Sequence, residues 1–433
     1  MPKIAMIGAG SVVFAKRLIY DILSFPELAG STISLMDIDA ERLDLIARLA
    51  TKLAEQEGFD VKIDATLDRR EALKGADYVI TMIQVGGLEA YELDIDIPMK
   101  YGIKQCVGDT LGPGGVFRGL RSIPVFLDIC KDMEELCPDA LLINYTNPMA
   151  MITWAINLAT GIKTVGLCHS VQGTAAQLAS YIGAPSEEVS YWVAGINHMA
   201  WFLRFEWNGR DAYPLLFEAM GRPEVYSKDK VRFEMMRHLG YFITESSGHL
   251  SEYVPYFRKR NELIDEFCTE GFGGETGFYL RHCRESWKPH YDRIRKQIAG
   301  EVPVDVERSH EYGAYIIHSI ETGTPRRING NVLNSGIITN LPQGCCVEVP
   351  CLVDDAGLHP CYIGDLPSQC AALNRTNINV QELAVRAALE RDRDLAFMAV
   401  MFDPLTAALL SPREIRKMVD EMFEAEARYL PGW

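Results

Sequence analysis

The sequence lacks a hydrophobic run of the roughly 18 residues that a helix needs to cross a bilayer. It is also poor in positive charge, since 43 lysines and arginines face 59 aspartates and glutamates and give a formal net charge of −16. A chain this acidic is a poor candidate for binding nucleic acid or an anionic membrane surface. We therefore expect neither a membrane protein nor a nucleic-acid-binding protein.

The eleven cysteines are scattered along the chain without the paired spacing of a disulfide framework. The first residues, MPKIAMIGAG, read as a strand that enters a glycine turn and not as a secretory signal. These two features predict free thiols and a cytoplasmic protein. Five cysteines near the C-terminus lack the C-x-x-C spacing of a zinc site and are interpreted as structural: Cys345, Cys346, Cys351, Cys361 and Cys370.

Hydrophobic residues make up 48% of the 433 positions, which is enough for a large core. In the first part of the chain, short apolar strands alternate with helix-length segments, which predicts an α/β fold with a Rossmann-type doubly wound parallel sheet. The expected strands are 3–7, 32–36, 61–63, 78–83, 140–145 and 164–167. From about residue 190 onward, hairpin-like strands and long polar helices indicate an α+β domain. We predict two domains, 1–195 and 196–433.

A glycine-rich turn follows the first expected strand and matches two of the three glycines of G-x-G-x-x-G. The residues of this turn are Gly8, Ala9, Gly10, Ser11 and Val12, and Val13 stands where the third glycine is usual. The two glycines permit a tight turn and a close approach of backbone N–H groups to a pyrophosphate. Asp37 ends the second strand, where a carboxylate accepts hydrogen bonds from a ribose 2′-OH and repels a 2′-phosphate. The segment predicts an NAD site, and the alternative is a Rossmann-like turn that has lost its ligand.

A cysteine and two histidines lie near the expected carboxyl edge of the sheet. Cys168 and His169 follow the strand at 164–167, where open α/β sheets bind ligands, and His198 lies in a turn at the junction of the two domains. Thiolate and imidazole are competent ligands for a divalent cation. A buried cysteine also packs as a small hydrophobic residue. From spacing alone, a metal site and a structural role both remain open.

Taken together, the motifs of the chain resemble glycoside hydrolase family 4. They occur in the order seen in that family: GAGSVVF, MDID, GDTLGPGGVFRGLR, NYTNPM, GLCHS, GINHM and SSGHLSEYVPYFRK. The resemblance covers essentially the whole chain. It implies an NAD-binding first domain similar to lactate and malate dehydrogenases, and a second domain for substrate, metal and oligomer contacts. It also implies an enzyme that uses NAD⁺ and a divalent metal, commonly Mn²⁺, held by Cys168 and His198.

The triplet Cys168-His169-Ser170 resembles the α-galactosidase subgroup of this family, whose substrates are similar to melibiose and raffinose. Members that act on 6-phosphorylated sugars tend to carry Asn or Asp after the cysteine. Members with another residue in the third position act on α-glucosides or uronides, so α-glucosidase, α-galacturonidase and α-glucuronidase remain alternatives. Because relatives are dimers or tetramers, the resemblance also implies a homodimer or a homotetramer.

The mechanism that the resemblance implies is an elimination assisted by a transient oxidation. NAD⁺ takes hydride from C3 of the sugar, a base removes the acidified C2 proton, and the leaving group departs from C1. Water then adds and the hydride returns to C3, so no net oxidation occurs. A metal bound to the C2 and C3 oxygens stabilises the enediolate that forms on the way.

The resemblance also assigns roles to individual residues. Tyr253 is predicted to be the base, because a tyrosine serves this role in relatives, with His249 and Glu252 as substitutes. Asp109 and His169 are both candidates for binding the substrate and protonating the leaving oxygen, and the choice between them stays open. Asn147 is expected to hydrogen-bond the C2 or C3 hydroxyl.

Two further groups of residues are given looser interpretations. Gly112, Gly114 and Gly115 are predicted to serve a mobile loop over the site. Arg118, Arg258 and Arg281 contact sugar or dinucleotide on one interpretation and lie on solvated helix faces on the other.

Two rival functions belong to other classes. A hydroxy-acid dehydrogenase would need an arginine for the substrate carboxylate and a His–Asp pair, but no thiolate metal site. A non-catalytic NAD-binding redox sensor would bind the dinucleotide without turning over a glycoside.

Overall fold

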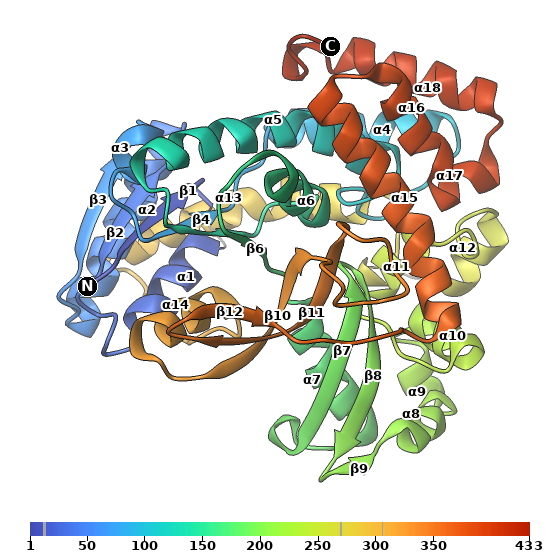
Figure 1. Ribbon diagram of the computed structural model, residues 1–433, viewed down its shortest axis with the longest axis horizontal. Coiled ribbons are helices and arrows are strands. Elements are labelled where there is room, and N and C mark those ends of the chain that lie inside the picture. Colours follow the sequence, from blue (N-terminus) through green and yellow to red (C-terminus); the bar gives the residue numbers. More distant parts are fainter. Residues whose placement is uncertain (12–13, 269–270, 305) are drawn as a thin grey trace.

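The computed structural model of the protein describes residues 1–11, 14–268, 271–304 and 306–433 (Figure 1). Its strands are β1 (Lys3–Ile7), β2 (Thr32–Met36), β3 (Lys62–Thr66), β4 (Tyr78–Thr81), β5 (Leu141–Asn144), β6 (Thr164–Gly166), β7 (Val189–Ile196), β8 (Met199–Trp207), β9 (Arg210–Asp211), β10 (Arg326–Leu333), β11 (Cys346–Asp354) and β12 (Gly357–Pro360).

The helices of the first half are α1 (Phe14–Leu23), α2 (Ala40–Glu57), α3 (Arg69–Leu73), α4 (Gly87–Lys100), α5 (Gly112–Leu136), α6 (Met149–Ala159) and α7 (Ser170–Ile182). Those of the second half are α8 (Tyr213–Met220), α9 (Pro223–Tyr226), α10 (Lys230–Leu239), α11 (Ser247–Tyr253), α12 (Asn261–Phe267), α13 (Phe278–Ala299), α14 (Tyr312–Thr322), α15 (Ser368–Glu390), α16 (Arg393–Phe402), α17 (Pro404–Leu409) and α18 (Pro412–Ala425).

The first six strands form a parallel sheet in the order β3-β2-β1-β4-β5-β6. This is the strand order of a dinucleotide-binding Rossmann sheet, and it confirms the predicted doubly wound fold. The central strands are mostly apolar because helices cover both faces of the sheet; all four residues of β4 are buried. In Figure 1, α5 and α3 lie above this sheet, whereas α1 and α14 lie below it.

The sheet continues beyond β6 into the second half of the chain. Strand β10 pairs antiparallel with β6, and β11 follows it and pairs with β7, which forms a hairpin with β8. The full order is β3-β2-β1-β4-β5-β6-β10-β11-β7-β8-β9, with β12 on β11. Strands from both predicted domains therefore share one hydrogen-bonded sheet. The boundary at 195/196 falls inside β7, and the division into two domains stays a prediction.

The prediction of a mobile glycine loop at 112–115 is wrong. Helix α5 begins at Gly112, and Gly112, Gly114 and Gly115 are buried in its first turns. A Cβ atom on Gly114 would lie 2.7 Å from the carbonyl oxygen of Gly108, closer than van der Waals contact permits. These glycines let the start of α5 pack directly against the preceding backbone, which is the opposite of a mobile role.

The C-terminal helices α15 to α18 return to the first half of the chain, where α15 packs against α5 and α6, and α18 packs against α4 (Figure 1). A fully buried ion cluster holds this contact. The guanidinium of Arg121 on α5 binds Asp94 on α4 and Glu426 just after α18. No helix of the described residues is both long and apolar enough to span a bilayer.

Candidate active site

Side chains from three separate segments meet at the carboxyl edge of the parallel sheet. Cys168 follows β6, His198 lies in the turn between β7 and β8, and Glu245 precedes α11. The Sγ atom of Cys168 is 3.4 Å from Nε2 of His198, and the same nitrogen is 3.5 Å from Oε2 of Glu245. One potential ligand atom from each side chain lies within 4.8 Å of the other two. A thiolate, an imidazole and a carboxylate at this spacing fit a divalent cation.

The sheet explains why two of these segments meet. Asn331 on β10 pairs with Gly166 on β6, two residues before Cys168. Across the next strand, Glu348 on β11 pairs with Gly195 on β7, three residues before His198. Strands β10 and β11 therefore bridge the Cys168 segment to the His198 turn and hold them in register.

Sequence reasoning missed Glu245. Its side chain is 18% exposed, and its second oxygen, Oε1, is 3.5 Å from Nδ1 of His249. The backbone of Glu245 is left-handed with φ 73°, and that of His198 with φ 62°. Non-glycine residues adopt this conformation rarely, and such residues gather at functional sites. No local sequence pattern predicts this backbone for a glutamate, so the sequence offered no signal for it.

Helix α11 carries the predicted base. The Ser246 side chain caps the helix by accepting a hydrogen bond from the backbone N–H of His249. One turn later, the hydroxyl oxygen of Tyr253 lies 3.2 Å from Nδ1 of His249 and 3.0 Å from Nδ1 of His198. Tyr253 is 2% exposed, so its hydroxyl is confined between the two imidazoles.

Glu252 is committed to a different task. Its buried carboxylate accepts hydrogen bonds from the backbone N–H groups of Cys106, Val107 and Gly108. Nε2 of Gln105 donates a fourth hydrogen bond at 3.2 Å, which fills the acceptor positions of the carboxylate. Glu252 therefore anchors the loop that leads into Asp109 and is not placed to act as the substitute base.

Asp109 and Asn147 belong to the same network as Tyr253. Oδ2 of Asp109 accepts a hydrogen bond from Nδ2 of Asn147 at 3.1 Å, and Oδ1 accepts one from the hydroxyl of Thr110 at 2.7 Å. The Thr110 hydroxyl is also 3.3 Å from Nδ1 of His198. Residues from the loop before α5, the end of β5 and the β7–β8 turn are thus linked side chain to side chain.

The charges around Asp109 keep it ionised. Burial alone would raise the pKa of Asp109, but the positive charge of Arg118 and the neighbouring imidazoles of His249 and His198 outweigh it, and the pKa lies below its usual value. Arg118 is held in place because its Nε donates to the carbonyl oxygen of Asn147 at 3.1 Å. Asp109 is therefore a hydrogen-bond acceptor at neutral pH.

The rest of the cluster is rich in negative charge. Burial raises the pKa of the Cys168 thiol well above its usual value, and the carboxylates of Glu245 and Glu348 add to the effect. Burial and the carboxylates of Asp109, Glu252 and Glu245 likewise raise the pKa of Tyr253. A bound divalent cation would act in the opposite direction on both groups.

Several buried polar atoms near the cluster have no hydrogen-bond partner. Both carboxylate oxygens of Glu348 and both polar side-chain atoms of Asn197 are in this state. Burial raises the pKa of Glu348 to about 7. Unsatisfied buried groups are costly, and they concentrate where a site receives a ligand or an ion. Donor chemistry and unsatisfied atoms both fit a cation at this place.

His169 lies at the outer side of the cluster, at the N-terminal end of α7. Its side chain is 65% exposed, and Nδ1 is 3.7 Å from Oε1 of Glu311. Burial raises the pKa of Glu311 even though the charge of His169 opposes it. His169 therefore follows Cys168 in the sequence, but its side chain lies on the solvent side of the cluster.

The glycine turn lies at the carboxyl ends of β1 and β2. The backbone N–H groups of Gly8 and Ala9 donate to the carbonyl oxygen of Met36, and that of Gly10 donates to Oδ2 of Asp37 at 2.8 Å. Asp37 thus fixes the turn, and each of its oxygens keeps a second lone pair for a ribose hydroxyl. Val12, like Val13, lies outside the described residues.

Ser11 precedes α1, whose N-terminus is the part of this turn that can receive a phosphate. The glycine turn follows β1 and Asp37 follows β2, while Asn147 and Cys168 follow β5 and β6. Because these strands are parallel, their carboxyl ends share one edge of the sheet. The dinucleotide turn and the Cys168–His198–Glu245 cluster therefore open on the same edge.

The other two arginines named from the sequence do not face this site. Arg258 is 1% exposed and donates to Ser251 Oγ and the carbonyl oxygen of Gly274. Arg281 is partly exposed and pairs with Glu275 at 2.7 Å. Of the three, Arg118 lies in the network around Asp109.

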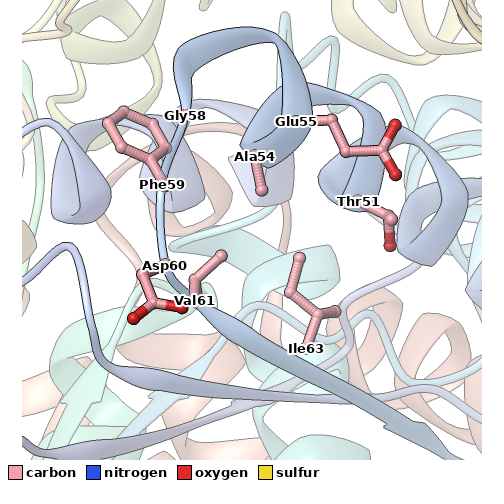
Figure 2. Close-up of a pocket in the computed structure, with 8 residues that line it drawn as sticks. All are labelled: Thr51, Ala54, Glu55, Gly58, Phe59, Asp60, Val61 and Ile63. Carbon is pink, nitrogen blue, oxygen red and sulfur yellow. The ribbon is translucent and has the colours of Figure 1, made fainter.

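A surface pocket of about 490 Å³ lies elsewhere, between the end of α2 and the start of β3 (Figure 2). Figure 2 shows the residues that line it, Thr51, Ala54, Glu55, Gly58, Phe59, Asp60, Val61 and Ile63. No residue predicted to act in the site lines this pocket.

Two family models match the chain. The model described as Family 4 glycosyl hydrolase matches residues 3–184, and the model described as Family 4 glycosyl hydrolase C-terminal domain matches residues 193–406.

Curated relatives match the chain along its whole length. An alpha-galactosidase of Bacillus subtilis (strain 168) is 44% identical over 437 residues and covers 100% of both chains. An alpha-galactosidase of Rhizobium meliloti (strain 1021) is 43% identical, covering 100% of this chain and 89% of its own. An alpha-galacturonidase of Thermoanaerobacterium saccharolyticum is 32% identical, covering 99% of this chain and 97% of its own.

Solved structures share the fold. The lplD protein of Bacillus subtilis superimposes with a TM-score of 0.88 at 27% identity, over 98% of this chain and 99% of its own. A 6-phospho-beta glucosidase of Thermotoga maritima, solved with manganese, NAD⁺ and glucose-6-phosphate, gives a TM-score of 0.82 at 24% identity over 98% of both chains. Malate dehydrogenase of Plasmodium falciparum gives 0.54 at 14% identity, over 92% of this chain and 100% of its own, in agreement with the expected dehydrogenase-like fold.

Proposed function

The chain belongs to family 4 of the glycosyl hydrolases, and from this premise we propose that it is an α-galactosidase that uses NAD⁺ and a divalent cation, Mn²⁺. The family predicted from the sequence is confirmed. The reaction is the hydrolysis of an α-glycoside, which is redox-neutral, so a hydride passed to NAD⁺ would have to return to the sugar. Its substrates are small sugars of the melibiose or raffinose type.

Full-length identity supports galactose as the sugar. Two alpha-galactosidases share 44% and 43% of their residues with this chain, whereas the alpha-galacturonidase shares 32%. The triplet Cys168-His169-Ser170 points the same way. Glucosides and uronides remain the alternatives within the family.

The observation that carries the proposal is the convergence of Cys168, His198 and Tyr253. Cys168 Sγ is 3.4 Å from one nitrogen of the His198 ring, and the Tyr253 hydroxyl is 3.0 Å from the other. A cation bound by Cys168 and by Nε2 of His198 would therefore be separated from the Tyr253 hydroxyl by the His198 ring. A plain hydroxy-acid dehydrogenase has no use for this arrangement.

Cys168 and His198 would hold the cation, and the turn from Gly8 to Ser11 with Asp37 would hold the dinucleotide. When bound, the dinucleotide supplies a hydride acceptor for C3 of the sugar, and the cation supplies a Lewis acid for the C2 and C3 oxygens. The protein contributes the orientation of these groups, because the segments that carry them end at one edge of a single sheet.

Proton movement follows from the tautomer of His198. With a cation held at Nε2, Nδ1 of His198 would carry the hydrogen and donate it toward the Tyr253 oxygen, which lies 3.0 Å away. The Tyr253 hydroxyl in turn donates to Nδ1 of His249. Tyr253 can thus take the C2 proton while its own hydrogen moves to His249. We assign Tyr253 as the base and His249 as its partner.

Asp109 and His169, the two candidates for the acid, differ in their surroundings. Asp109 is held ionised, so it serves as an acceptor for a sugar hydroxyl, and Asn147, hydrogen-bonded to it, orients the same part of the ring. His169 remains as the donor to the leaving oxygen, with Glu311 orienting its ring. Its place on the solvent side suits a leaving group that points outward.

We further propose a cytoplasmic homodimer or homotetramer. The location is supported by the eleven cysteines, all of which are free thiols. Light scattering coupled to gel filtration measures the assembly, and a monomeric mass at micromolar concentration would refute it.

The function is tested by hydrolysis of p-nitrophenyl α-galactoside with Mn²⁺, NAD⁺ and a reductant, each omitted in turn. We expect activity that requires all three, and lower activity on the α-glucoside. Substrate-dependent accumulation of NADH beyond the amount of enzyme would favour the dehydrogenase. Binding of NAD⁺ without any glycoside turnover would favour the redox sensor.

A further inference from the structure

Two residues at the cation cluster adopt a left-handed backbone. His198 has φ 62° and Glu245 has φ 73°, values that side chains with a Cβ atom rarely adopt. The result is that their side chains meet, with Glu245 Oε2 3.5 Å from His198 Nε2. This nitrogen is the one that faces Cys168. A backbone held in an unfavourable conformation at this point indicates that the position of the carboxylate matters.

The ligand atoms of the cluster converge as they would around a cation. One potential ligand atom from each of Cys168, His198 and Glu245 lies within 4.8 Å of the other two. The guanidinium of Arg232 pairs with Asp229 through Nε and Nη2, and its Nη1 donates to the backbone carbonyl oxygen of Glu245 rather than to the carboxylate. A sulfur, an imidazole nitrogen and a carboxylate oxygen gathered at one point are a donor set that a divalent cation accepts.

Building on the function proposed above, we propose that Glu245 is the third protein ligand of the divalent cation, binding through Oε2 beside Cys168 Sγ and His198 Nε2. Its other oxygen, Oε1, lies 3.5 Å from Nδ1 of His249. The set of one sulfur, one nitrogen and one oxygen leaves coordination positions open for sugar oxygens.

A carboxylate in this set also bears on which metal is bound. Thiolate and imidazole alone suit Zn²⁺, whereas a carboxylate oxygen is a hard ligand of the kind that Mn²⁺ prefers. Glu245 therefore shifts the relative affinity of the site toward Mn²⁺. Its removal should weaken binding of Mn²⁺ more than binding of Zn²⁺.

The test measures metal binding to the purified full-length chain, without substrate or NAD⁺. Mn²⁺ is titrated with detection by electron paramagnetic resonance, and Zn²⁺ by calorimetry. We expect Glu245→Gln to raise the Kd for Mn²⁺ about tenfold or more, with a smaller change for Zn²⁺. With Co²⁺ in place of Mn²⁺, the thiolate-to-metal absorption band persists in this variant and is lost in Cys168→Ser.

Glu234→Gln is the matched control. Glu234 lies on α10, its side chain is 19% exposed, and it pairs with His238 at 3.7 Å. Its exposure and its distance to a histidine are therefore similar to those of Glu245. We expect its Kd for Mn²⁺ to equal that of the wild type. An equal rise in both variants would attribute the effect to general loss of structure and would overturn the proposal.

A glycine variant separates ligation from a structural role. Glycine adopts φ 73° without strain, so Glu245→Gly should unfold at the same temperature as the metal-free wild type or higher, while its Mn²⁺ affinity falls as in Glu245→Gln. It also replaces Glu245→Gln if that variant does not fold. An unchanged Kd in a folded Glu245 variant would overturn the proposal.

The metal-binding test of Glu245 can succeed or fail independently of the proposed α-galactosidase function. If wild-type protein hydrolyses the α-galactoside while Glu245→Gln binds Mn²⁺ as tightly as wild type, the ligand role fails and the function stands. If Mn²⁺ binding depends on Glu245 but no glycoside is hydrolysed, the function fails and the ligand role stands.

Discussion

Replacing Tyr253 with phenylalanine removes one oxygen atom from the centre of the proposed site. The ring of Tyr253 is buried and the phenylalanine ring fills the same volume, so no cavity forms. The hydroxyl contacts Nδ1 of His198 and Nδ1 of His249, and both nitrogens lose a partner. We expect a loss of about 1–2 kcal/mol of folding free energy.

The effect on catalysis should be much larger than the effect on stability. A base positioned for proton transfer contributes about 10²–10⁴ in rate, which corresponds to roughly 3–5 kcal/mol of barrier. We therefore expect kcat of Tyr253→Phe to fall by about 10²–10⁴ while the Kd for Mn²⁺ stays within about twofold of wild type. The assay is hydrolysis of p-nitrophenyl α-galactoside at saturating Mn²⁺ and NAD⁺.

Exchange of the C2 hydrogen with solvent reports directly on the proton-removal step assigned to Tyr253. In D₂O the wild type should place deuterium at C2 of the released galactose, and nuclear magnetic resonance detects it. The control variant is Tyr256→Phe, since Tyr256 lies in the same segment but is 45% exposed, and it should behave as wild type. A kcat of Tyr253→Phe within about threefold of wild type would refute the role of Tyr253, because a missing base costs at least about 10².

Three further outcomes follow from the structure. Glu252→Gln places an amide against three backbone N–H donors, so thermal or urea unfolding should show a loss of about 2–4 kcal/mol even with Tyr253 intact. Gly10→Ala puts a Cβ atom 2.7 Å from Oδ2 of Asp37, so calorimetry should show a weakened affinity for NAD⁺ by about tenfold or more, with Mn²⁺ binding unchanged. Because the pKa of Glu348 is raised to about 7 in the folded protein, the folded state binds the proton more tightly than the unfolded chain does, and metal-free stability falls as pH rises from about 4.5 to 7. Glu348→Gln should make that slope shallower, and it should be up to about 3 kcal/mol more stable than wild type at pH 8; an unchanged slope in urea unfolding across this range would contradict the assignment.

The sequence predicts the buried strands better than the exposed ones. The strands expected at 3–7 and 32–36 are found at Lys3–Ile7 and Thr32–Met36, because a parallel strand covered on both faces is mostly apolar and stands out from its surroundings. Strand β3 lies at the edge of the sheet and alternates polar with apolar residues, so only its beginning was expected. The continuation of the sheet through β10 depends on a pairing between residues 166 and 331, which no local pattern reveals.

The residues of the candidate site also differ in how well the sequence predicts them. Cys168, His198 and Tyr253 could be named because a recognisable motif surrounds each of them, and the structure brings them together. Glu245 was missed because its role depends on a left-handed backbone, which the surrounding fold imposes. The glycines at 112–115 were misread because the sequence cannot distinguish a glycine that permits motion from one that permits close packing.

The unbroken ladder from β3 to β9 limits how this molecule can move. A hinge that swings the two halves of the chain apart would have to break the pairing of β10 with β6. Movements of short segments at the sheet edge leave this pairing intact. A cut between residues 184 and 189 should therefore leave two fragments that stay associated, joined by the β6–β10 pairing and by the packing of α15 against α5 and α6 and of α18 against α4.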